Sequence, residues 1–386
     1  MRARLPISQL RLLYLIAALL DLSVSSTTFA ISRRAAELEA TALQLGLLGS
    51  IWLGVYALCA PISGHFSDRM SRRWMALFGS SLAALSTLAC AFTTNIPWLL
   101  FLTSVMGIGV GIFWPPIISW VGEGLSGPAL AMRMSRFSVS WNVGMFTGFY
   151  LSGSLFEIGP AFAICLSAGT LVLIALLLLV PVPSEDQSQS AATIPALTRI
   201  PKGRGFRKTA WLSNFAMLFA VTGTLALFPQ MATSLGIRPK LHGELLVFHR
   251  MAALGVAILW PHVRFWQTRL WPLWIAECIC ALGVLGVGFG LNVWEFGAAL
   301  VACGAMLGFN YQASLFFTLE EMSDKGKGSG IHEAMLGAGA FFGPAMAGWV
   351  GQHSASLRAP YFFCAASVVF WIAVQMAIVV WRRRVR

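Results

Sequence analysis

Twelve long apolar runs constrain this chain more than any other feature of its sequence. Each run has about 20 residues, the length of helix that crosses the hydrocarbon core of a bilayer. Only 11% of the 386 residues are charged and 57% are hydrophobic, too few charges to cover a soluble protein of this size. The runs are 11–31, 43–63, 74–93, 97–120, 135–156, 160–182, 210–234, 243–262, 270–290, 293–317, 330–351 and 359–381.

The basic residues gather in alternate loops between these runs, and Lys and Arg favour the cytoplasmic side of a membrane. With the N-terminus placed inside, most of the 27 Lys and Arg fall on that side. The exceptions are Arg33, Arg34, Arg238, Lys240, Arg358 and Arg250. Short loops without an Asn-x-Ser/Thr site fit a bacterial inner membrane. We therefore expect a multi-pass protein with both termini cytoplasmic, whose net charge of +12 meets membrane lipids and not nucleic acid.

A polar segment divides the runs six and six. We expect residues 1–182 to form one six-helix bundle, 183–209 a cytoplasmic linker rich in Ser, Gln and basic residues, and 210–386 a second bundle. A shift of 197 residues places Gly107 on Gly304 and Gly111 on Gly308. The sequence thus predicts an all-α monomer of twelve transmembrane helices in two pseudo-symmetric bundles, with the binding site of a transporter between repeats.

The loop after the second run carries the sharpest motif, GHFSDRMSRR. It resembles the signature Gly-x-x-x-Asp-Arg/Lys-x-Gly-Arg/Lys-Arg/Lys of the major facilitator superfamily, although Ser71 replaces one glycine. The matching residues are Gly64, Asp68, Arg69, Arg72 and Arg73.

The resemblance implies that this loop is a conformational latch. Gly64 would let two helices approach closely. Asp68 would accept backbone hydrogen bonds at the start of the eleventh span, near Gly330, and favour the outward-open state. The three arginines would pair with loop acids or lipid phosphates; the alternative is that they only set the topology.

Two glycine-rich stretches favour close helix packing. The fifth run contains Gly144-x-x-x-Gly148, and the eleventh contains GAGAFFGPAMAG, from Gly337 to Gly348. Antiporters of the superfamily often carry the Gly-Pro version in the fifth span, whereas here it lies in the eleventh. Plain helix packing and a gating role both remain open for these stretches.

Asp21 and Arg250 are the ionisable residues that best fit a functional site inside the membrane, where a charge costs about 2.5–3.5 kcal/mol. Asp21 lies mid-way along the first run, in a stripe with Ser25 and Thr28. Partial desolvation favours its protonated form, which suits proton binding and release. Arg250 stays charged and needs an anionic substrate or an acid, for which Asp21 and Glu277 compete.

Aromatic and amide side chains in the runs could complete a substrate pocket. Packing is the alternative for each aromatic residue, whereas an unpaired amide is costly in lipid. These candidates are Trp52, Tyr56, Trp114, Asn142, Asn310 and Tyr311.

These features predict a secondary transporter. We expect it to move a small organic solute by alternating access, coupled to protons, with export as the direction. The chain has no nucleotide-binding loop of the Gly-x-x-x-x-Gly-Lys-Ser/Thr kind, and it offers no metal set or catalytic triad, so we expect neither an enzyme nor a cofactor. The alternatives are an uncoupled facilitator and a transporter-like scaffold or sensor without flux.

Overall fold

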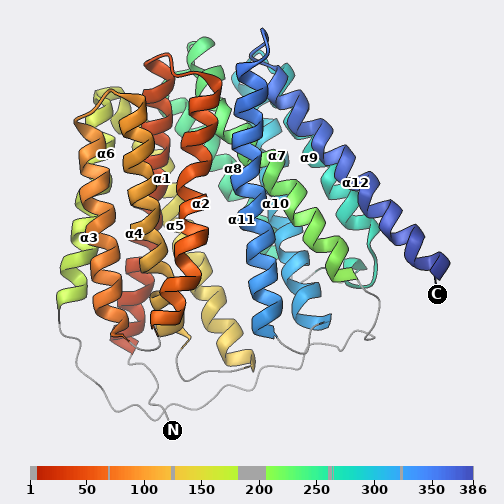
Figure 1. Cartoon of the computed structure of the whole chain (residues 1–386), viewed down its shortest axis with the longest axis horizontal. Coiled ribbons are helices and arrows are strands. Elements are labelled where there is room, and N and C mark those ends of the chain that lie inside the picture. Colours follow the sequence, from red (N-terminus) through yellow and green to blue (C-terminus); the bar gives the residue numbers. More distant parts are fainter. Residues whose placement is uncertain are drawn as a thin grey trace. The chain divides into compact units, whose positions relative to one another are not determined.

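The computed structural model is helical throughout the part of the chain that it describes. The described residues are 7–67, 70–122, 127–180, 206–259, 263, 265–321 and 325–385. Within these ranges the chain forms twelve α-helices, the short 3-10 helix η2 (Phe265–Thr268) and no strand (Figure 1). The predicted all-α fold of twelve long helices is confirmed.

Many of the helices extend beyond the predicted apolar runs, because backbone hydrogen bonding continues where hydrophobic side chains give way to polar ones. Among the described residues, ten helices are long and apolar enough to cross a membrane. The other two, α5 and α8, carry arginines such as Arg136 and Arg250. The helices are α1 (Ile7–Glu37), α2 (Ala42–Ser67), α3 (Arg72–Ala91), α4 (Ile96–Val121), α5 (Gly127–Ile158), α6 (Pro160–Leu179), α7 (Phe206–Ser234), α8 (Pro239–Leu259), α9 (Trp271–Phe289), α10 (Val293–Glu321), α11 (Lys325–Gln352) and α12 (Ala359–Val385).

The chain forms two compact units. Unit 1 comprises Met1–Arg34 and Gly54–Thr198, and unit 2 comprises Ala35–Leu53 and Arg199–Arg386. The first part of α2 therefore belongs to unit 2 and its second part to unit 1. The division into bundles 1–182 and 210–386 stays a prediction, and most of the linker 183–209 lies outside the described residues.

In unit 1, α3 packs against α4 and α6, while α5 packs closely against α1. A Cβ atom added at Gly144 would collide with the carbonyl oxygen of Ala18, and one added at Gly148 would collide with that of Leu22. The backbones of α1 and α5 therefore touch directly, and we call such a contact between glycines and carbonyl groups a seam. The close packing predicted for Gly144 and Gly148 is confirmed.

In unit 2, α7 packs against α10, α11 and α12, and its contact with α11 is again made at glycines. A Cβ atom at Gly339 would lie 2.6 Å from the carbonyl oxygen of Phe215, and one at Gly343 would collide with that of Phe219. Further along α11, Gly348 lies against the first part of α2. The eleventh-helix glycines therefore permit close helix packing, as predicted, and their gating role stays a prediction.

The internal repeat is visible in the helix contacts. A Cβ atom at Gly111 of α4 would lie 3.3 Å from the carbonyl oxygen of Tyr56 in α2. In unit 2, a Cβ atom at Gly308 of α10 would lie 2.7 Å from the carbonyl oxygen of Ala253 in α8. The shift of 197 residues relates both members of the two pairs, so equivalent helices meet at equivalent positions.

Candidate functional site

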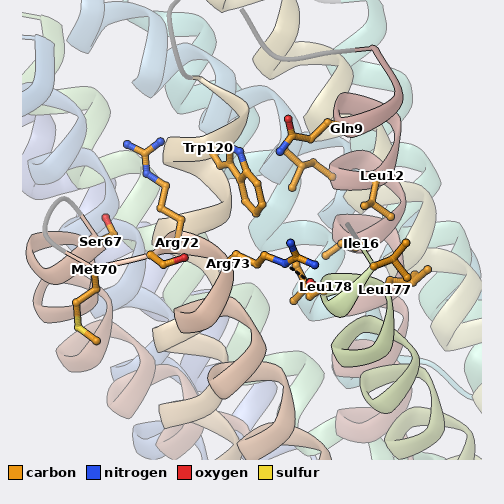
Figure 2. Close-up of a pocket in the computed structure, with 13 residues that line it drawn as sticks. Gln9, Leu12, Ile16, Ser67, Met70, Arg72, Arg73, Trp120, Leu177 and Leu178 are labelled. Atoms are coloured by element: carbon orange, nitrogen blue, oxygen red, sulfur yellow. Dashed lines mark hydrogen bonds between the residues drawn. The ribbon is translucent and has the colours of Figure 1, made fainter. Parts of the chain in front are cut away.

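Unit 1 contains a cavity of about 760 Å³ at the end where α1 begins and α4 and α6 finish. Two arginines of the loop motif, Arg72 and Arg73, line it together with Gln9 and Trp120 (Figure 2). The Nε atom of Arg73 donates a hydrogen bond to the carbonyl oxygen of Leu178 in α6. The motif arginines that the structure describes therefore share one site inside unit 1.

The other members of the predicted latch are less informative. Asp68 and Arg69 lie outside the described residues. The nearest described atom to a Cβ added at Gly64 would be the Cβ of Pro115, at 3.8 Å, an ordinary van der Waals separation. The close helix approach expected at Gly64 is not seen among the described residues, and the latch itself stays a prediction.

Asp21 lies in α1 beside the seam with α5 and is only 7% exposed. The hydroxyl of Ser25 donates to the backbone oxygen of Asp21 at 2.6 Å, and that of Thr28 donates to Val24 at 2.9 Å. The neighbouring hydroxyls of the polar stripe therefore bond to their own helix. The Asp21 side chain is therefore buried and not turned outward to lipid.

The remaining predicted residues of unit 1 are half-buried. The Asn142 side-chain nitrogen donates to the carbonyl oxygen of Ser138, one turn earlier in α5, at 2.9 Å. Trp114 meets Phe137 edge-on, with ring centroids 5.7 Å apart. Tyr56 contributes its backbone to the contact with α4. No described contact brings these side chains together into one pocket.

In unit 2, Asn310 is completely buried, and its nitrogen donates to the hydroxyl of Ser213 in α7 at 2.7 Å. The ring of Tyr311 meets that of His332 in α11, with centroids 5.1 Å apart. His332 Nδ1 in turn lies 3.0 Å from the hydroxyl of Ser314. Two predicted residues of α10 therefore take part in a polar core between α7, α10 and α11.

Arg250 and Trp52 are half-buried residues of unit 2. Glu277, one predicted partner of Arg250, is completely buried and accepts a hydrogen bond from Gln375 in α12 at 2.7 Å. Gln375 accepts another from Trp274 at 3.2 Å. Glu277 thus joins α9 to α12, which supports its structural interpretation. The choice between Asp21 and Glu277 as the partner of Arg250 stays open.

The sequence analysis missed Asn214 of α7. Its side chain is completely buried, and both amide atoms lack a hydrogen-bond partner among the described residues. A buried amide without a partner costs about 1–3 kcal/mol. The argument that selected Asn142 and Asn310, that amides are costly in an apolar run, applies equally to Asn214 and could have found it.

Comparison with known proteins decides the family. The sequence model of the Major Facilitator Superfamily matches residues 13–325, which is most of the chain. The chain belongs to the major facilitator superfamily. Members of this superfamily are multi-pass membrane transporters that bind small molecules, so the predicted class of transporter, and not of enzyme, is confirmed.

Individual relatives match the chain over shorter stretches. It is 29% identical to sugar phosphate exchanger 3 of Bos taurus over 138 residues, 34% of this chain and 28% of that protein. It is 28% identical to the niacin transporter NiaP of Acinetobacter baylyi over 115 residues, 29% of this chain and 26% of that protein. The chain thus matches less than a third of the length of these curated relatives. A crystal structure of the nucleoside transporter NupG shares the fold, with a TM-score of 0.71, 13% identity, and coverage of 95% of this chain and 98% of that one.

Proposed function

We propose that this superfamily member moves a small organic anion across the membrane by alternating access, in a cycle coupled to a proton. The observation that carries the proposal is the burial of Asp21, which is 7% exposed inside α1. Ionising a carboxylate at that depth costs about 2.5–3.5 kcal/mol. A change between the protonated and ionised forms during transport would explain why the chain carries a carboxylate at this depth despite this cost.

Arg250 supports an anionic solute. It lies near the middle of α8, and a guanidinium remains charged at any ordinary pH. Bidentate hydrogen bonds make Arg well suited to carboxylate and phosphate groups. The relatives named above transport sugar phosphates and niacin, which are anions at neutral pH, and their names support the same class of solute for this chain.

Transport into proteoliposomes tests the proposal. A panel of organic carboxylates and phosphate esters is offered under an imposed pH gradient. Asp21→Asn should lower gradient-driven accumulation at least tenfold, whereas the exposed control Glu37→Gln on the same helix should retain it. Arg250→Gln should raise the KM for the anion at least tenfold, with the exposed Arg238→Gln as its control.

The two alternatives give different results in the same assay. An uncoupled facilitator predicts that Asp21→Asn leaves the response to the pH gradient unchanged. A scaffold or sensor predicts no flux of any solute under any gradient. Either result would overturn the proposal.

The proposal includes a bacterial inner-membrane location, cytoplasmic termini, a monomer and export as the direction. The many arginines at the predicted cytoplasmic ends of the helices support the orientation. Reporter fusions at both termini test the orientation, and mass measurement in detergent tests the monomer. Uptake into inside-out vesicles exceeding that into right-side-out vesicles would support export, and the reverse would contradict it.

A further inference from the structure

The interior of unit 2 contains four oxygen-bearing side chains that come from three helices. Thr209 and Ser213 lie one turn apart on the same face of α7, while Glu277 belongs to α9 and Asn310 to α10. Each of the four is at most 1% exposed. The Asn310 amide nitrogen donates to the Ser213 hydroxyl at 2.7 Å, and that hydroxyl also bonds to the Glu277 carboxylate. Ser213 therefore brings α9 and α10 together at one point of α7.

Three oxygens of this group have no hydrogen-bond partner among the described residues. They are Thr209 Oγ1, Glu277 Oε2 and Asn310 Oδ1. Buried polar atoms in folded proteins nearly always have a partner, so each exception requires an explanation. Three such oxygens in one group point to a ligand that accepts their lone pairs and that no described side chain supplies.

The charge of Glu277 indicates the kind of ligand. An ionised carboxylate in the interior requires a positive partner. The described side chains that bond to Glu277 are Gln375 and Ser213, and both are neutral. The helices α9 and α10 contain no Lys or Arg. The ligand that fits these oxygens is therefore a cation.

The basic residues of the other helices packed against α9 lie toward helix ends. In α7, Arg207 bonds to the main-chain oxygen of Glu321, and Lys208 is exposed. In α12, the first arginine is Arg382, near the end of the helix and well beyond Gln375. These side chains are therefore poorly placed to neutralise a carboxylate at the level of Ser213.

We propose that these oxygens bind a sodium ion inside unit 2. Glu277 Oε2 supplies one negative charge, which balances a monovalent ion. The hydroxyl oxygens of Thr209 and Ser213 and the amide oxygen of Asn310 are hard, neutral donors of the kind that such cations prefer, whereas soft metals favour thiolate ligands. Because Asn310 and Ser213 are within hydrogen-bonding distance, the group is compact and favours Na⁺ over the larger K⁺. The bound ion would join α7, α9 and α10 and stabilise unit 2.

Thermal unfolding of the full chain in detergent tests the site, with choline chloride replaced stepwise by sodium chloride at constant ionic strength. Sodium at about 100 mM should raise the midpoint temperature by roughly 1–3 °C, and potassium by less than half as much. Glu277→Gln should abolish the rise while unfolding close to the unmodified chain in choline alone. The exposed control Glu295→Gln in α10 should keep the rise. Asp21→Asn should keep it as well, because the proposed proton site is a different site.

A second variant keeps the test independent of the carboxylate. Thr209→Val replaces the hydroxyl by a methyl group and breaks no described hydrogen bond of the side chain. It should leave the midpoint in choline unchanged or higher, and raise the sodium concentration that gives half of the rise at least threefold. Radioactive sodium should bind the purified protein and fail to bind the Glu277→Gln variant.

Three results would overturn the proposal. They are a midpoint that does not respond to sodium, an equal response to potassium, and an undiminished response in Glu277→Gln. A pairing of Glu277 with Arg250 in place of an ion would give the first of these results.

Discussion

The helices α1 and α7 are equivalent in the repeat, yet they place different residues beside the same kind of seam. The shift of 197 residues relates Ala18 and Leu22, which meet α5, to Phe215 and Phe219, which meet α11. The same shift places Asp21 of α1 on Leu218 of α7. The backbone contact is repeated whereas the acid is not, so the seams are common to both units and an acid at this position is particular to unit 1.

The helices α2 and α8 show the complementary difference. Arg250 of α8 corresponds to Leu53 of α2. By contrast, the glycine contact between α2 and α4 is repeated between α8 and α10. Unit 1 therefore carries the proposed proton-binding acid, Asp21, and unit 2 the proposed anion-binding arginine, Arg250, while the buried acid of unit 2, Glu277, bonds to Gln375. In our proposal, the transport cycle therefore binds the proton in unit 1 and the anion in unit 2.

The largest expected effect comes from replacing a glycine of a seam, where α1 contacts α5 or α7 contacts α11. Gly144→Val and Gly343→Val should each destabilise the protein by more than about 3 kcal/mol, because the new side chain meets a backbone that cannot move aside. Thermal unfolding in detergent measures the loss. Gly169→Val is the matched control, since an added Cβ there has no described atom within 4 Å. If only one seam proved sensitive, the two units would not be equivalent in packing.

An acid placed in α7 at the position equivalent to Asp21 tests whether α7 accepts a charge as α1 does. Leu218→Asp should lower stability by about 3 kcal/mol, since Leu218 is only 9% exposed in a membrane-spanning helix. Leu218→Asn separates the effect of charge from that of polarity. A Leu218→Asp protein as stable as the original would show that α7 accepts an acid as readily as α1 does.

Substitutions of Glu277 test whether this buried acid of unit 2 takes part in transport or only stabilises the fold. Glu277→Leu should cost about 2 kcal/mol, because Gln375 loses its acceptor, whereas Glu277→Gln keeps an acceptor and should cost less than about 1 kcal/mol. Transport in proteoliposomes should keep its KM in both variants. A tenfold rise in KM in Glu277→Gln would contradict the structural interpretation.

The smallest expected effect concerns Asn214, whose counterpart in α1 is Ala17. Asn214→Leu should raise stability by about 1 kcal/mol, since it removes a buried amide without a partner among the described residues. Asn310→Leu is the comparison variant and should lower stability, because it breaks the hydrogen bond to Ser213. A loss of stability in Asn214→Leu equal to that in Asn310→Leu would contradict this account.

The fold could be predicted from the sequence because its determinants are local. The length of an apolar run and the spacing of glycines are both visible within one helix, and the structure confirms the long helices and both seams. The burial of Asp21 followed from its depth in the first run. Each of these inferences needs only a few neighbouring residues and the dimensions of a bilayer.

The cavity of unit 1 could not be predicted in the same way. Its walls come from α1, the start of α3 and the ends of α4 and α6, which are distant in sequence. The motif drew attention to Arg72 and Arg73, but nothing local revealed that Gln9 and Trp120 leave space beside them.

The seams described for both units consist of main chain against main chain, with glycine on one side and carbonyl groups on the other. Contacts of this kind depend on the absence of a side chain at a few positions and tolerate almost any apolar neighbour elsewhere. The helices of this chain are therefore held together at a few glycine positions, and most other positions along the seams are free of this constraint. Substitutions that alter the solute could therefore be made at those other positions while the backbone contacts of the seams stay in place.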